Sequence, residues 1–115
     1  MKRLNECQNF TAKEKALLSR CYDAIKKISP NAKVILYGSR ARGNADPESD
    51  YDLLILVENP TNLKEEDIFR QQLFPIEIEM GCVLTVNVYN YRDWNSQLYR
   101  AMPFHKNVER EGLFL

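Results

Sequence analysis

The chain has 115 residues, and its 16 basic and 16 acidic side chains give a formal net charge of zero. A chain of this length is expected to form one domain, residues 1–115, around a single core. The balanced charge argues against tight, sequence-independent binding to nucleic acid. The sequence shows no apolar run of membrane-spanning length, no signal peptide and three widely spaced cysteines. We therefore expect a soluble cytoplasmic protein with reduced thiols.

The first expected elements are a helix and a strand. Thr11 and Glu14 have the spacing of a capping box at the start of a helix. Apolar residues then recur at helical spacing as far as Ile28, and Pro30 ends the pattern. The apolar run at 33–37 predicts the first strand.

A second strand is predicted at 51–57, where the apolar run stops at Asn59 and Pro60. Residues 62–80 are expected to form a helix that is kinked or restarted at Pro75. Three apolar side chains of this helix are expected to face the core: Ile68, Leu73 and Phe74.

The region before the third strand has two interpretations. Residues 76–79 alternate between apolar and acidic side chains, so a hairpin turning at Gly81 is an alternative to the helix. Residues 83–89 predict the third strand, and a helical tail follows it.

The end of the tail also has two interpretations. Its last residues, 113–115, are all apolar, and Phe104 and Val108 lie one helical turn apart. Either this segment folds back to complete the core, or a second subunit or a helical partner covers it.

Residues 37–53 carry the strongest functional indication. Gly38 and Ser39 interrupt one apolar run, and Asp50 and Asp52 open the next. Because side chains alternate along a strand, acids two positions apart point the same way. Two carboxylates beside a glycine turn suit hard divalent cations that also hold phosphate oxygens. The segment predicts a nucleotide-handling metal site.

The order of apolar residue, Gly-Ser, a spacer of about ten residues and Asp-apolar-Asp-apolar resembles the nucleotidyltransferase superfamily that includes DNA polymerase beta. Within it, Gly-Ser-Arg-Ala-Arg-Gly and Ser-Asp-Tyr-Asp-Leu look like the minimal nucleotidyltransferases of bacteria and archaea. The resemblance implies an α/β (α+β) nucleotidyltransferase fold. We expect a short mixed sheet, here of three strands, with helices packed largely on one side.

The resemblance also implies a chemistry. Asp50 and Asp52 would be the catalytic residues and would hold Mg²⁺. A nucleoside triphosphate, expected to be ATP, would lie at a short helix that begins after Gly-Ser. The nucleotide would contact four residues: Gly38, Ser39, Arg40 and Arg42. The expected reaction transfers a nucleoside monophosphate to an acceptor hydroxyl on a protein or a small molecule.

One departure from the superfamily favours a second hypothesis. Active members usually carry a third acid on a later strand, whereas the polar face of 83–89 offers Thr85 and Asn87. An amide cannot act as a base at neutral pH. Glu77 or Glu79 would supply the acid if the hairpin forms. Otherwise the chain is a catalytically weak, nucleotide-binding antitoxin or regulatory module that binds a helical HEPN-family partner. A homo-oligomer is a further expected assembly.

Other conspicuous residues are expected to have structural roles. His105 has no ligand or nucleophile at useful spacing, and Tyr89, Tyr91 and Trp94 are more typical of core than of base-stacking positions. Residues 109–111 are expected to form an exposed, charged turn.

Overall fold

The computed structural model describes residues 1–59 and 63–115. Its described strands form one mixed sheet in the order β1-β5-β2-β3-β4. Their bounds are β1 Lys2–Arg3, β2 Lys33–Tyr37, β3 Tyr51–Val57, β4 Leu84–Asn90 and β5 Leu113–Phe114. The helices are the 3₁₀ turn Leu4–Glu6, α1 Ala12–Ile28, α2 Ser39–Arg42, α3 Leu63–Met80, α4 Tyr91–Trp94, α5 Gln97–Arg100 and α6 Pro103–Glu111.

The sheet combines parallel and antiparallel pairs. β2 runs antiparallel to both β3 and β5, whereas β3 and β4 are parallel and β1 and β5 are parallel. The prediction of three strands is corrected to five in the described residues. β1 and β5 are two residues long, so neither gives the alternating pattern by which a strand is found in a sequence.

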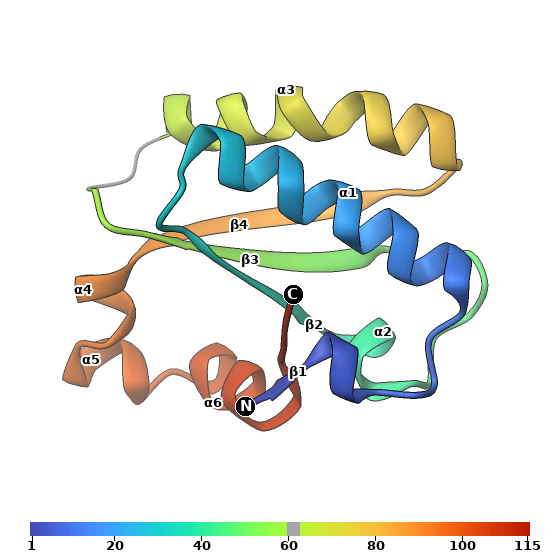
Figure 1. Ribbon diagram of the computed structural model, residues 1–115. Helices are drawn as coiled ribbons and strands as arrows, with labels where there is room; N and C mark the ends of the chain where they lie inside the picture. Colours follow the sequence, from blue (N-terminus) through green and yellow to red (C-terminus); the bar gives the residue numbers. More distant parts are fainter. Residues whose placement is uncertain (60–62) are drawn as a thin grey trace.

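Helices lie on both faces of the sheet, with the two long ones together. α1 and α3 lie side by side over one face, and α4, α5 and α6 lie on the other (Figure 1). The α1/α3 face covers the larger cluster of buried side chains, including Leu53 and Ile55 of β3. A smaller cluster on the opposite face contains Leu54, Trp94 and Val108. β3 is therefore covered on both sides and forms the centre of the core.

Helix α1 confirms the capping-box prediction. The Thr11 hydroxyl accepts a hydrogen bond from Glu14 N–H, and the Glu14 carboxylate accepts one from Thr11 N–H. Reciprocal bonds of this kind satisfy two amide groups that a helix start leaves unpaired.

Helix α3 decides between the two interpretations of its region. It continues through Pro75 to Met80, so the hairpin alternative is wrong. Its buried side chains are Phe69, Leu73 and Ile76, spaced as one helical stripe. Leu73 was predicted to be buried, but Ile68 and Phe74 are 41% and 58% exposed. Two predicted boundaries, the strand stop at Pro60 and the helix start at Asn62, lie outside the described residues.

The C-terminal segment folds back onto the sheet. Leu113 is buried in β5, and Leu115 N–H donates to the Val34 carbonyl at 2.9 Å. Val108 is fully buried, and Phe104 packs at 5.3 Å from the Tyr37 ring, so neither belongs to an exposed apolar face. This confirms the first interpretation of the tail and removes the basis for a partner on it. Across the described ranges, the helices lack the combination of length and apolar character that crossing a membrane requires.

Candidate nucleotide-binding site

The two acids of the motif reach the same end of the sheet. Tyr51 and Leu53 of β3 are buried under α1 and α3, so Asp52 between them points to the opposite face. Asp52 lies between Tyr37 of β2 and Thr85 of β4 in the sheet register. The Thr85 hydroxyl donates to Asp50 Oδ2 at 3.4 Å. The structure thus brings Asp50 and Asp52 together beside the ends of three strands.

The electrostatics of Asp52 favour a cation beside it. Burial raises the pKa of this carboxyl above its ordinary value, and the negative charge of Asp50 raises it further. The Arg42 charge lowers the pKa, and Glu111 opposes that effect. Ionised Asp52 therefore lacks full compensation within the protein, and a divalent cation would supply it.

A magnesium ion fits these donors only with help from its substrate. Within residues 1–59 and 63–115, acidic, histidine and cysteine side chains form no group of three able to hold a metal. Mg²⁺ is commonly held by one or two carboxylates together with substrate phosphates and water. Asp50 and Asp52 match that arrangement.

Gly38 brings the backbone against Asp52. Its φ of 79° and ψ of −160° end β2 and begin α2 at Ser39, which confirms the predicted short helix. A Cβ atom on Gly38 would overlap the Asp52 carboxylate. Only glycine combines this backbone conformation with such an approach. We call Gly38–Ser39 the phosphate turn.

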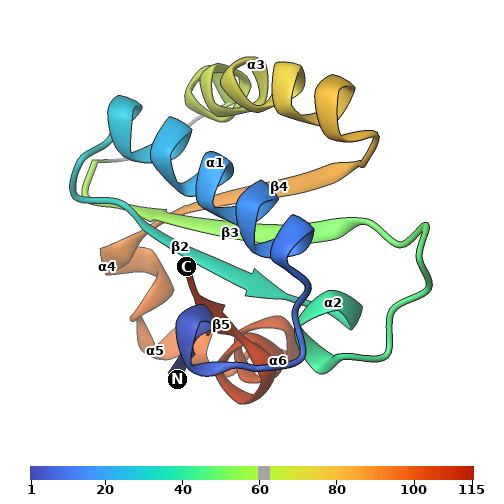
Figure 2. The ribbon, with the colours of Figure 1, turned by 45° about the vertical axis from the view of Figure 1, so that its right-hand side comes forward.

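Glu111, at the end of α6, joins the site although the sequence predicted an exposed turn there. Its carboxylate accepts hydrogen bonds from Gly38 N–H at 3.2 Å and from Arg42 Nη1 at 2.9 Å. The Glu111 side chain is 10% exposed. Figure 2 shows α2 and α6 meeting at the same end of β2. Gly112 followed by three apolar residues was the available indication of a chain returning to the sheet.

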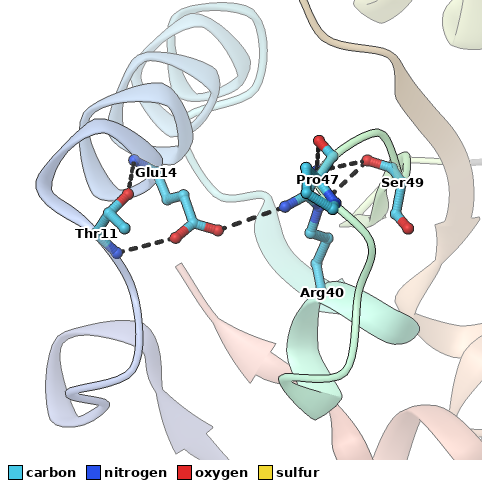
Figure 3. Close-up of polar contacts among 5 residues, drawn as sticks. All are labelled: Thr11, Glu14, Arg40, Pro47 and Ser49. Carbon is cyan, nitrogen blue, oxygen red and sulfur yellow. Dashed lines mark hydrogen bonds and ion pairs between the residues drawn. The ribbon is translucent and has the colours of Figure 1, made fainter.

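Arg40 is directed away from the two acids. Its guanidinium donates to the carbonyls of Pro47 and Ser49, pairs with Glu14 at 3.6 Å and lies 4.3 Å from the centre of the Tyr51 ring (Figure 3). These contacts hold the loop between α2 and β3 against the start of α1. The phosphate contact of Arg40 stays a prediction, and the contacts that Arg40 makes here are with the loop and α1. Arg42, half-exposed beside Glu111, lies within the electrostatic reach of Asp52.

The strand on which the superfamily usually carries its third acid has only uncharged polar side chains on the Asp52 face. Thr85 and Asn87 lie on the Asp52 face of β4, and Asn87 Nδ2 donates to the Tyr37 hydroxyl at 2.7 Å. Glu77 accepts from Leu84 N–H, and Glu79 pairs with Arg20 at 2.6 Å. Both glutamates belong to α3, which covers the other face. The suggestion that either supplies the third acid is therefore wrong.

The remaining conspicuous aromatic residues are structural. Trp94 is buried and stacks on His105, with ring centres 4.3 Å apart. His105 is itself buried, and its Nε2 has no hydrogen-bond partner in the described structure. Tyr89 packs against Trp94 at 5.3 Å.

Known proteins place these features in one family. A 34-residue segment is 59% identical to a Methanocaldococcus jannaschii protein named "Putative protein adenylyltransferase"; it covers 30% of this chain and 34% of that protein. The chain thus matches about a third of that relative's length. A solved structure of the Cid1 poly(U) polymerase with MgGTP bound aligns over 70% of this chain and 32% of its own, with a TM-score of 0.44 and 19% identity. The nucleotidyltransferase domain model matches residues 18–109, and the chain therefore belongs to the nucleotidyltransferase domain family.

Proposed function

We propose that the chain transfers a nucleoside monophosphate from a nucleoside triphosphate to an acceptor hydroxyl. The observation that carries this proposal is the contact between the phosphate turn and the carboxylate of Asp52, with Asp50 beside it. A site that handles triphosphates needs a backbone that phosphate can approach and carboxylates that share a cation with it. Both are present at one end of β3, in a chain of the matching family.

Each residue has a defined part in this proposal. Asp50 and Asp52 would hold Mg²⁺, which would neutralise triphosphate charge and stabilise the leaving pyrophosphate. Gly38 carries no Cβ atom, so the Asp52 carboxylate lies directly against the turn, where its cation would also meet a phosphate. The Ser39 hydroxyl and the outer edge of the Arg42 guanidinium would contact phosphate oxygens. The acceptor oxygen would bond to the α-phosphorus as the bond to the β-phosphate oxygen breaks.

The name of the Methanocaldococcus jannaschii relative supports a protein as acceptor and ATP as donor, and its matched segment is 59% identical to this chain. We therefore place protein adenylylation first among the acceptor classes, ahead of a small-molecule hydroxyl.

Calorimetry with ATP tests the binding part of the proposal. We expect binding that requires Mg²⁺ and that Asp52→Asn weakens by at least about tenfold, or 1.4 kcal/mol. Asp23→Asn is the matched control, because Asp23 is exposed on α1, far from the site. Equal affinity in the wild type and Asp52→Asn would contradict the proposal.

A second candidate, a binding module with weak catalysis, is favoured by the amide at Asn87. Such a module would bind nucleotide and act on a helical HEPN-type protein or on a second copy of itself. Transfer of label from ATP carrying an α-³²P phosphate separates the two candidates. If Asn87 limits turnover, Asn87→Asp should raise the rate of labelling at least about tenfold. A fast wild type that this substitution does not improve would exclude the weak module.

A further inference from the structure

Glu111 joins two parts of the site that are far apart in the sequence. One carboxylate oxygen accepts the Gly38 N–H at 3.2 Å and the other accepts Arg42 Nη1 at 2.9 Å. The side chain is 10% exposed, so it is almost enclosed by the protein. A carboxylate with both oxygens engaged is held in one orientation, and it gives the Arg42 guanidinium a charged partner on the α6 side.

The backbone fixes Glu111 in that place. β5 begins two residues later and pairs with β2 through Leu113 and Leu36. Between them, a Cβ on Gly112 would lie 2.5 Å from the Val108 carbonyl oxygen and 2.9 Å from Ile35 Cγ2. The end of α6 is therefore packed tightly against β2, and the backbone of Glu111 cannot move away without separating them.

Arg42 lies between competing acids. It ends the four-residue helix α2, whose N-cap residue, Gly38, lies against the Asp52 carboxylate. The Arg42 side chain is 47% exposed and keeps donors beyond the one given to Glu111. A released guanidinium would pair with the carboxylates of Asp50 and Asp52 at this end of the sheet, in the space that a cation needs.

We propose that Glu111 is a positioning residue that holds Arg42 on the α6 side of the phosphate turn and so keeps Asp50 and Asp52 free for a metal ion. The held guanidinium then presents its outer edge to a phosphate instead of neutralising the metal-binding acids. This inference rests on the proposed function, because it assigns a part to a residue beside the same metal-binding pair.

Mn²⁺ alone, titrated into the protein and followed by electron paramagnetic resonance, is the probe. We expect Glu111→Gln to weaken Mn²⁺ binding about tenfold. Glutamine can still accept the Gly38 N–H, so the turn keeps a partner, and thermal melting checks the fold. Glu109→Gln is the matched control, because it removes the same charge from an exposed position on α6 and should leave Mn²⁺ affinity unchanged.

Loss of the Glu111 charge also weakens cation binding directly, and a double variant separates that effect. In the Arg42→Gln background, Glu111→Gln should change Mn²⁺ affinity by less than about threefold, so that removing Arg42 rescues the glutamate variant. If Glu111→Gln lowered Mn²⁺ affinity equally in the wild type and in Arg42→Gln, the inference would be overturned, because none of the effect would depend on Arg42.

Two further outcomes keep the test decisive. If Glu111→Gln does not fold, Arg42→Gln alone decides. If Glu111 already holds the guanidinium away from the two acids, Arg42→Gln should change Mn²⁺ affinity by less than about threefold. A tenfold increase in Mn²⁺ affinity in this variant would overturn the inference. Failure of the wild type to bind Mn²⁺ in an Asp52-dependent way would instead contradict the proposed metal site.

Discussion

At the scale of single residues, the site depends on how closely Gly38 approaches Asp52. The glycine adopts a backbone conformation that other residues rarely occupy, and its missing side chain is the space in which the carboxylate lies. One residue therefore sets both the path of the chain and the position of the Asp52 carboxylate.

Gly38→Ala should lower the free energy of unfolding by about 1–3 kcal/mol, because alanine is strained at this φ and ψ. It should also displace Asp52 and reduce ATP affinity. Gly81→Ala separates the two effects. Gly81 has a φ of 66° but no atom within 4 Å of an added Cβ, so this variant should lose stability and keep ATP affinity. Denaturant unfolding and calorimetry on both variants provide the comparison.

Asp52 also predicts how stability changes with pH in metal-free buffer. Folding raises its pKa above the value of 3.8 that applies to the unfolded chain, mainly through burial. The folded state then binds the proton more tightly, so its stability falls as pH rises through the folded-state pKa. Asp52→Asn has no carboxyl to ionise, so it does not undergo this fall in stability.

We therefore expect Asp52→Asn to melt at a higher temperature than the wild type at pH 7 with EDTA. The difference should disappear below pH 3.8, where the aspartate is protonated in both states. A variant less stable than the wild type at pH 7 would show that ionised Asp52 is fully compensated within the protein.

At the scale of elements, Arg40 joins the start of α1 to the loop that leads into β3. Its guanidinium donates to two loop carbonyls and lies beside Glu14 of the α1 capping box (Figure 3). The loop ends at Asp50. Arg40 thus holds the backbone that leads to Asp50 and Asp52, from the opposite side of the sheet.

Arg40→Met should lower the free energy of unfolding by about 1.5–3 kcal/mol, the range for hydrogen bonds to a charged group. Amide exchange in the loop should become faster, because the carbonyls of Pro47 and Ser49 lose their donor. Arg92→Met is the matched control, since Arg92 is exposed and its guanidinium makes no hydrogen bond or ion pair within the described residues. An equal loss of unfolding free energy in Arg40→Met and Arg92→Met would refute this role.

The sequence predicted those elements whose pattern is local. Helix α1 has its capping box and its apolar stripe, and β2 and β3 were placed correctly because each is a continuous apolar run. β4 begins at Leu84, one residue later than predicted. α3 was found and Leu73 was assigned to its buried side correctly. Ile68 and Phe74 were assigned wrongly, because apolar residues occur all round the helix and only packing selects Phe69 and Ile76.

Residues whose roles depend on distant partners could not be predicted in the same way. Asp50 and Asp52 share a face by alternation alone, so their proximity followed from the sequence. Glu111 lies 73 residues from Gly38, and no spacing rule connects the two. Arg40 and Arg42 look equivalent in sequence, yet the four-residue helix α2 directs them to opposite sides of the sheet.

At the scale of the whole molecule, the last strand completes the sheet. β5 lies between β1 and β2, and Leu113 is 6% exposed there. Because Glu111 lies two residues before this strand, the packing of β5 and the geometry of the phosphate turn are linked.

Leu113→Ala should therefore lower the free energy of unfolding by about 2–5 kcal/mol through the cavity that it leaves. It should also weaken ATP binding, although Leu113 touches no proposed ligand. Leu98→Ala is the control, because Leu98 is 75% exposed on α5 and should change neither property. Thermal melting and calorimetry measure the two effects, and normal ATP affinity in a destabilised Leu113→Ala would separate β5 from the site.

The placement of β5 also determines the order in which the protein can assemble during synthesis. Until residues 113 and 114 leave the ribosome, β2 has a partner only along β3, and the amides on its other edge are unpaired. Contacts between such distant segments form late in folding. A nascent chain therefore carries Asp50 and Asp52 before it has a finished phosphate turn, which requires that residues 113 and 114 have been synthesised and paired with β2.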